Sequence, residues 1–382
     1  MFHRMRTLAL AALALAAAAP AASAQSDILL RLRSGSPPGD RFRVDSAGGV
    51  VAIGELGIGI IPASGAGYRM MWYPFKAAFR AGGTDDGGAG NYWDDANTGF
   101  YSWAGGNQTV AKAFATFAFG DQVQVTGVDA AGFGGSNIVG GTAAFSAGAS
   151  NHACGFGSVA IGFTNTAGSI LPTCSSGGQG SVAIGYRVTA DADYAVALGH
   201  RASANGHPGV FVAGDQSTTD SIEAVANNEF AARYAGGYRF RTNATLTTGC
   251  NLPAGSGVFS CSSSRMLKEH FATVDGEDLL ARFRQVPVNT WSYIGEPGGV
   301  RHLGPFAEDF RAAFGLGIDS QSIGLLDIAG VNFAAVKALE ARTAQLQQKQ
   351  GEVDRLRAQV TSLEGRLQEL EVLVRQLAAK QP

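Results

Sequence analysis

The sequence predicts a mainly β protein that ends in a helical coiled coil, and three observations support this fold class. Glycine occurs 53 times in 382 residues, about double its usual share. A short motif ending in glycine recurs every fourteen residues, and valine and leucine form heptads at the C-terminal end. Glycine does not recur every third residue as in collagen. With 46% apolar and only 16% charged residues, disorder is also excluded, which leaves a repetitive β architecture.

The chain begins with a pattern typical of a secretory signal peptide over residues 1–24. Arg4 and Arg6 precede a short apolar run, and the small residues 22–24 form a cleavage site before Gln25. No later segment reaches the ~20 apolar residues that a spanning helix needs. We therefore expect a secreted or cell-surface protein without a transmembrane anchor after signal removal.

Residues 25–100 predict a separate N-terminal β region. Apolar residues alternate over residues 27–51, and a Pro-Pro-Gly-Asp turn interrupts them. The bulky apolar cluster at residues 70–75 is expected in a core or at a contact between chains rather than as a ligand platform. Asp85 and Asp86 lack the spacing of a calcium motif, so a solvated turn is the preferred interpretation.

The repeat is clearest at residues 158–162, 181–185 and 195–199, which read SVAIG, SVAIG and AVALG. Counting back from the first of these in fourteens reaches four further glycines: Gly148, Gly134, Gly120 and Gly106. The step from Gly162 to Gly185 is fourteen plus nine, and the surplus carries Cys174. A short fixed period indicates a solenoid whose units are stable only when stacked.

Each unit predicts one coil of two short strands and two turns. Val159 and Ile161 share one face of a strand, and Ser158 and Ala160 share the other. We expect the larger pair to point into the core and the small pair to face a neighbouring surface. The repeats over residues 102–214 resemble the heads of YadA-like trimeric adhesins. This resemblance implies a left-handed β-roll that assembles as a homotrimer at the cell surface, but it names no ligand.

The four cysteines form two close pairs, Cys154 with Cys174 and Cys250 with Cys261. Two local disulfides are the simplest of three connectivities in an exported chain. Metal binding is the alternative, but the sequence has no CxxC spacing and no clustered histidine. We expect no cofactor and no metal. The net charge of −2 gives no electrostatic basis for binding nucleic acid.

Before the second pair of cysteines, residues 228–242 predict a β-hairpin around Gly236 and Gly237.

From Ser263 onward, short motifs follow one another in a fixed order. Ser263 stands five residues before Lys268, which Glu269 follows. Further motifs are LLARF at 279–283, PVNTWSY at 287–293, RHLGPFAEDF at 301–310 and DIAGV at 327–331. Together they resemble the endosialidase-type intramolecular chaperone of tailspikes and tail fibres. The resemblance implies a domain that drives trimerisation of the preceding fibre and then cuts itself off at a serine.

The same resemblance assigns Ser263 as the nucleophile and Lys268 as the general base. A serine hydroxyl needs a base, and lysine serves as one only when burial or nearby positive charge lowers its pKa. Assembly could therefore switch the reaction on. The family's Asp after the serine is Ser264 here, so an uncleaved chaperone with a surface Lys268 stays open. His302 lies in the family's His-x-Gly-Pro motif, which implies a packing or trimer-contact role.

The C-terminal heptads predict a coiled coil with valine or leucine at every a and d position: Val353, Leu356, Val360, Leu363, Leu367, Leu370, Val374 and Leu377. Upstream, Leu339 and Leu346 keep the register, but the d positions Arg342 and Lys349 are polar. Valine at a with leucine at d favours two strands. The repeats and the chaperone imply three chains, and we expect a trimeric coiled coil.

The predicted organisation has six parts: signal peptide 1–24, N-terminal β region 25–100, β-roll head 101–215, hairpin and disulfide connector 216–262, chaperone domain 263–338 and coiled coil 339–382. Its expected function is that of an exported homotrimeric fibre- or adhesin-like surface protein, with a host or matrix glycan or protein as the open ligand class. A passive spacer with an uncleaved chaperone is the first alternative. A carbohydrate-active enzyme is the second, but residues 25–250 lack a dense cluster of carboxylates.

Overall fold

The computed structural model describes residues 27–35, 38–85, 90–169, 174 and 177–379, so the predicted signal peptide lies outside the described residues. The chain divides into two compact units, residues 1–262 and 263–382. The described residues are mainly β with three α-helices, of which the last is long. None of these helices combines the length and the apolar character needed to cross a bilayer.

The N-terminal strands form a small antiparallel sheet of β1 (Ile28–Ser34), β2 (Gly39–Asp45) and β3 (Val50–Ala52) in that order. This confirms the strands predicted over residues 27–51. Leu30 pairs with Val44 and Leu32 with Phe42, so one face of the sheet is apolar. The opposite face carries arginines, because Arg31 pairs with Arg43 across the two strands.

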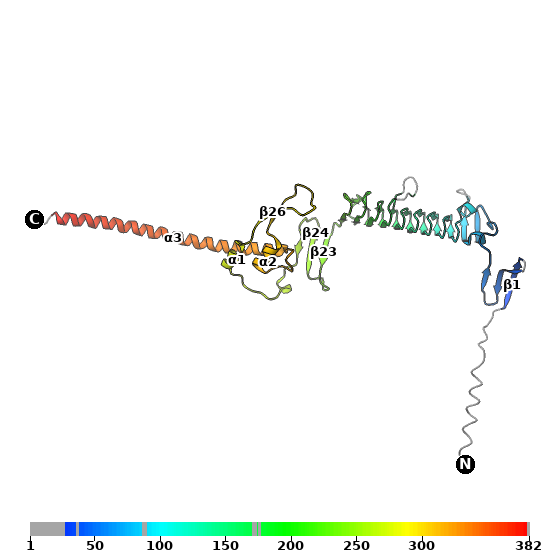
Figure 1. Cartoon of the computed structure of the whole chain (residues 1–382), viewed down its shortest axis with the longest axis horizontal. Helices are drawn as coiled ribbons and strands as arrows, with labels where there is room; N and C mark the ends of the chain where they lie inside the picture. Colours follow the sequence, from blue (N-terminus) through cyan, green and yellow to red (C-terminus); the bar gives the residue numbers. More distant parts are fainter. Residues whose placement is uncertain (1–26, 36–37, 86–89, 170–173, 175–176, 380–382) are drawn as a thin grey trace, which may run out of the picture. The chain divides into compact units, whose positions relative to one another are not determined.

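The repeats form two sheets whose successive strands stack one behind another (Figure 1). The larger sheet contains, in order, β22 (Phe230–Arg233), β20 (Phe211–Gly214), β18 (Val196–His200), β16 (Val182–Tyr186), β14 (Val159–Phe163), β12 (Phe145–Ala149), β10 (Ala131–Gly135), β8 (Phe117–Asp121), β6 (Trp103–Asn107), β5 (Ala78–Thr84) and β4 (Gly67–Tyr73). The smaller contains β21 (Ile222–Glu223), β19 (Ala202–Ser203), β17 (Thr189–Ala190), β15 (Thr166–Ala167), β13 (His152–Ala153), β11 (Ile138–Val139), β9 (Gln124–Val125) and β7 (Val110–Ala111). Two 3-10 turns connect the first strands of the larger sheet: η1 (Pro74–Lys76) between β4 and β5, and η2 (Asp95–Asn97) between β5 and β6.

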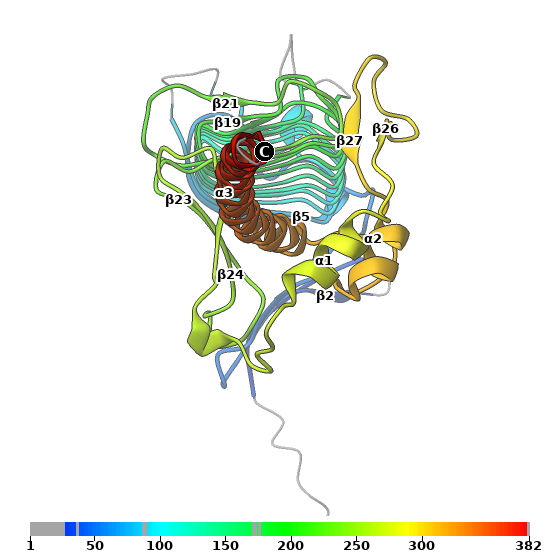
Figure 2. The ribbon, with the colours of Figure 1, turned by 90° about the vertical axis from the view of Figure 1, so that its left-hand side faces the viewer.

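The strand register confirms the fourteen-residue period. Phe117 pairs with Ala131 and Ala131 with Phe145 in parallel strands. Among the steps from β6 onward, the longest, from Val159 to Val182, holds the insertion that carries Cys174, and the last steps, to Phe211 and Phe230, also exceed fourteen residues. Cys174 is disulfide-bonded to Cys154, as predicted. Both sheets are open, and their coils overlie one another when viewed along the stack (Figure 2). The stacking continues past residue 215 to β22.

The orientation of the repeat strands corrects the sequence-based expectation. Ala160 and Ser158 are fully buried, whereas Val159 and Ile161 point outward and are half-buried. The prediction that the larger pair would fill the core is therefore wrong. The two walls of a coil lie too close for large side chains: a Cβ added at Gly132 would approach Val123 of the facing wall to 2.8 Å.

A ladder of asparagines occupies the core of three successive coils. Asn137, Asn151 and Asn165 are buried, and the side-chain oxygen of each accepts the backbone N–H fourteen or more residues later. The Asn151 amide also donates to the carbonyl oxygens of Ala147 and Gly162, at 3.1 and 2.9 Å. Through these bonds the buried side chains join the backbone of one coil to that of the next inside the core.

The predicted hairpin around Gly236 and Gly237 is wrong. β22 pairs with β20 of the stack, and from Gly237 the chain forms a separate sheet of β23 (Gly237–Arg241), β24 (Gly249–Pro253) and β25 (Ser260–Cys261). The hairpin that forms is β23–β24. The disulfide predicted between Cys250 and Cys261 joins directly opposed residues of β24 and β25.

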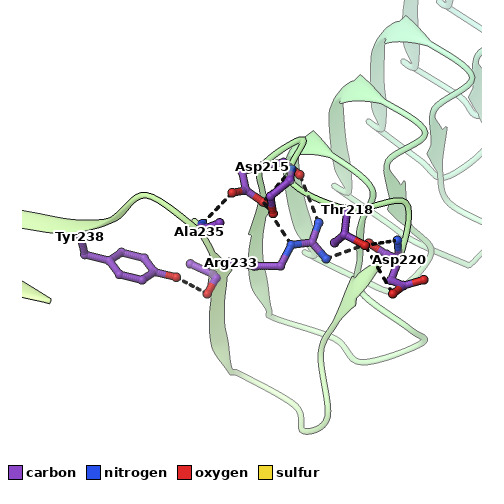
Figure 3. Close-up of polar contacts among 8 residues, drawn as sticks. Asp215, Thr218, Asp220, Arg233, Ala235 and Tyr238 are labelled. Atoms are coloured by element: carbon purple, nitrogen blue, oxygen red, sulfur yellow. Dashed lines mark hydrogen bonds and ion pairs between the residues drawn. The ribbon is translucent and has the colours of Figure 1, made fainter. Parts of the chain in front are cut away.

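A polar cluster closes the last coils of the stack (Figure 3). The Asp215 carboxylate accepts the N–H of Ala235 at 2.7 Å and contacts the Arg233 guanidinium at 3.2 Å. Arg233 also donates to the backbone carbonyl of Asp220 at 2.7 Å. These bonds, led by the Ala235 N–H, hold the pKa of Asp215 below its usual range.

The second unit is helical apart from one short hairpin. It contains η3 (Arg265–Leu267), α1 (Gly276–Phe283), β26 (Asn289–Trp291), β27 (His302–Gly304), α2 (Ala307–Phe314) and α3 (Leu325–Ala378). Asp275 caps α1 by accepting the N–H groups of Glu277 and Asp278. The small core is formed by Leu279 and Leu280 of α1 against the alanines Ala335 and Ala338 of α3.

Candidate functional site

The predicted nucleophile and base lie in contact at the start of the second unit. The Lys268 Nζ donates a hydrogen bond of 2.6 Å to the Ser263 Oγ. Both side chains are exposed in the single chain. The structure thus brings together the two residues that the sequence predicts as nucleophile and base. Their catalytic roles stay predictions.

The single 3-10 turn η3 explains how residues five positions apart meet. Ser264 precedes this turn and its Oγ accepts the Met266 N–H at 3.3 Å, which starts the turn. The Lys268 N–H donates to the Arg265 carbonyl at 3.2 Å, which ends it. An aspartate can also accept such a bond. Ser264 therefore starts the turn as an aspartate could, but it carries no negative charge.

The charge state of the lysine decides what this pair can do. As an ammonium, Lys268 only donates to the Ser263 Oγ and cannot take its proton. Proton transfer requires a neutral amine, and removal from water favours that form. In the single chain Lys268 is exposed, so its amine stays in contact with water there.

His302 lies in an aromatic cluster rather than beside Ser263 and Lys268. Its Nε2 hydrogen-bonds to both carboxylate oxygens of Glu296, at 3.0 and 3.1 Å. Its ring packs against Trp291 and Tyr293, with centroids 4.6 and 5.6 Å apart. The bond from His302, followed by the Tyr293 N–H, holds the pKa of Glu296 below its usual value. Sequence reasoning missed Glu296, because its glycine- and proline-rich loop carries no recognisable motif.

The described residues offer little for a cofactor or metal. No group of three or more His, Cys, Asp or Glu among them could hold a metal ion. Asp85 contacts the Gln108 side chain, and Asp86 of the predicted turn lies outside the described residues. A cleft of about 580 Å³ lies between α1, α2 and the start of α3, but neither Ser263 nor Lys268 lines it.

The heptad side chains of α3 remain uncovered in the single chain. Leu356, Leu363 and Leu370 are 53%, 61% and 59% exposed. Upstream, Arg342 forms an ion pair with Glu277 of α1. This pairing explains a polar d position, because α1 occupies that side of α3. The long helix is compatible with the predicted coiled coil.

Comparison with known proteins identifies one region of the chain. The family described as chaperone of endosialidase matches residues 263–315. The match begins at Ser263 and includes Lys268 and His302, which supports the predicted chaperone domain. This family indicates a trimer-assembly role in a tail-fibre-like protein. No curated protein and no solved structure matches the chain.

Proposed function

We propose that this chain is an exported homotrimeric fibre- or adhesin-like surface protein whose C-terminal intramolecular chaperone promotes assembly and then releases itself at Ser263. The observation that carries this proposal is the hydrogen bond from Lys268 to Ser263 at the first residue of the chaperone match. Both disulfides are consistent with export, because disulfides persist in oxidising compartments.

Uncovered apolar surface in both units supports assembly. The α3 seam is exposed along four heptads, and such a seam is stable in water only against other helices. In the repeats, Phe119, Phe133 and Ile184 point outward and are 47%, 37% and 38% exposed. We propose that the two open sheets are the walls of a left-handed β-roll and that these outward rows meet in the trimer.

Assembly and cleavage are linked in the proposed mechanism. A neighbouring chain that covers Lys268 removes its amine from water and favours the neutral form. The neutral amine takes the proton of the Ser263 Oγ, which attacks an adjacent backbone carbonyl. The peptide nitrogen leaves with a proton, and water hydrolyses the resulting ester. Cleavage then follows trimerisation and cannot precede it.

The uncleaved chaperone is the second candidate, and Ser264 favours it. The family's carboxylate at this position is lost, although the turn that joins Ser263 to Lys268 is kept. In this case the second unit would stay attached and the chain would act as a passive spacer.

Size and mass of the secreted full chain test the proposal. We expect a trimer by sedimentation and, on denaturing gels, a separate C-terminal fragment that starts beside Ser263. Ser263→Ala and Lys268→Ala should each abolish the fragment yet leave the trimer. Ser262→Ala, which alters the neighbouring serine, is the matched control and should cleave normally. An uncut trimer would favour the second candidate, and a monomer would contradict both.

A further inference from the structure

The N-terminal sheet carries a compact group of arginines that the proposed function does not use. Arg31, Arg33 and Arg43 surround the carboxylate of Asp40, at 3.4, 3.4 and 3.8 Å. Among the described residues no other carboxylate contacts any of the three. Three guanidinium groups therefore share one negative charge, and two positive charges are left uncompensated.

The register makes this arrangement unfavourable for the sheet itself. Arg31 lies directly opposite Arg43 across β1 and β2, and like charges in that position destabilise a strand pair. Arg41, also on β2, shows the usual way in which such a charge is compensated: it forms an ion pair with a single carboxylate, that of Glu55, at 2.9 Å. A local conflict without a structural gain is typical of a functional surface.

The guanidinium groups are available to a ligand. The side chains of Arg31, Arg33 and Arg43 are 41%, 53% and 42% exposed, whereas that of Asp40 is 19% exposed. Arg31 and Arg33 contact Asp40 through Nε. Among the described residues, the one hydrogen bond from their terminal nitrogens runs from Arg33 to the Pro38 carbonyl at 2.7 Å, which leaves the other terminal N–H groups able to donate to a ligand.

The three arginines favour a ligand with several anionic groups. Their guanidinium groups converge on one carboxylate, with the Nε atoms of Arg31 and Arg33 both 3.4 Å from the same Asp40 oxygen. Arginine binds carboxylate, sulfate or phosphate groups through two parallel bonds. Asp40 occupies the point where the three groups converge, so a ligand binds the donors that remain. A polymer with several acidic groups offers a partner to each arginine, whereas a small ion offers one anionic group.

We propose that the arginine face of β1 and β2 is a binding site for an acidic polysaccharide. Two uncompensated charges are too few for stable attachment to an anionic membrane, at about 1 kcal/mol per cation. Phe42, the one aromatic residue of β1 and β2, lies on the opposite face of the sheet, so the arginine face offers no ring on which the bases of a nucleic acid could stack. The site goes beyond the proposed function, because each chain carries the complete cluster whether or not copies assemble or cleave.

Binding of a heparin oligosaccharide to the full chain tests this site. The unmodified chain should bind it, and binding should weaken as salt rises, because exposed charges are screened beyond about 10 Å at 0.1 M. Combined Arg31→Gln, Arg33→Gln and Arg43→Gln substitution should weaken binding at least about tenfold. The matched control, Arg41→Gln with Glu55→Gln, removes a neutral pair from the same sheet and should leave the affinity within about twofold.

A lysine variant separates a built site from charge alone. Replacing the same three arginines with lysine keeps every charge and removes the paired donors, so we expect about a threefold or larger loss. This variant also decides the question if the glutamine variant fails to fold. Equal binding by the lysine variant, equal binding by a folded glutamine variant, or no heparin binding by the unmodified chain would overturn the proposal. Binding to phosphatidylserine vesicles without heparin binding would replace it with a membrane site.

Discussion

In the repeat region the smallest side chains are buried inside one chain, whereas in α3 the largest apolar side chains stay in water. Ala160 and Asn151 are fully enclosed by neighbouring coils. Leu363 and Leu370 of α3 are about 60% exposed. The stack therefore has a core before any partner arrives, while the long helix has none along its heptads.

This difference suggests a division of roles between the two regions. Stacked coils can form one after another, since each coil needs only its neighbour. An isolated seam of leucines gains its stability only when copies associate. Assembly should then depend chiefly on the second unit, and local stability of the stack chiefly on bonds within one chain.

Charges placed in the seam should have the largest effect. Leu363→Asp with Leu370→Asp would bury two carboxylates at d positions, which association cannot tolerate without partners. We expect no oligomer at a protein concentration where the unmodified chain is fully assembled, as measured by sedimentation velocity. The matched control is Val372→Asp, because this residue is also exposed on α3 but lies outside the seam. Normal assembly of the seam variant would remove α3 from the assembly mechanism.

Within the stack, loss of one ladder residue should be the next largest effect. Asn151→Ala leaves the buried Asn165 N–H without its side-chain acceptor and removes the amide that donates to the Gly162 carbonyl. An unsatisfied buried group costs about 1–3 kcal/mol, so we expect the free energy of unfolding of the repeat region to fall by about 2 kcal/mol. Urea denaturation, monitored through hydrogen exchange of the amides in the repeats, measures this change in the free energy of unfolding.

The control for the ladder is Asn107→Ala, on the exposed side of the same stack. Its amide bonds only to the exposed Asp121 carboxylate, at 2.7 Å. We expect a change within about 0.5 kcal/mol. Equal effects of the two substitutions would mean that burial of the ladder does not stabilise the coils, and the contrast with α3 would lose its physical basis.

How far the sequence predicts these features depends on the range over which each is determined. The fourteen-residue period and both disulfides are local patterns that the structure confirms, and the long helix α3 is compatible with the heptads. The contact of Ser263 with Lys268 also follows from a short segment, because one turn spans it.

Features that depend on pairing between distant residues were not predictable in the same way. The direction of Ala160 depends on how closely the facing wall approaches, which a single unit does not reveal. Residues 228–242 do not form the predicted hairpin, because β22 pairs with β20 rather than with β23. The arginine face needs the register that places Arg31 opposite Arg43. In each case the missing quantity is a tertiary distance.

The smallest expected effect concerns acid and the cluster that closes the stack. The pKa of Asp215 is lowered in the folded state, chiefly by the Ala235 N–H, against about 3.9 in an unfolded chain. Its contribution to stability is therefore complete above pH ~4 and is lost as the pH falls through the folded pKa. Hydrogen exchange at the Ala235 N–H should accelerate as the pH falls through this pKa, relative to exchange in the preceding coils.

In the Asp215→Asn variant this N–H should exchange faster already at neutral pH, and its exchange should lose the acid dependence. Asp220→Asn should keep it, because Arg233 binds the backbone of Asp220 and not its carboxylate. If Asp215→Asn retained the acid dependence, the end of the stack would be closed by its coils alone, as its interior is.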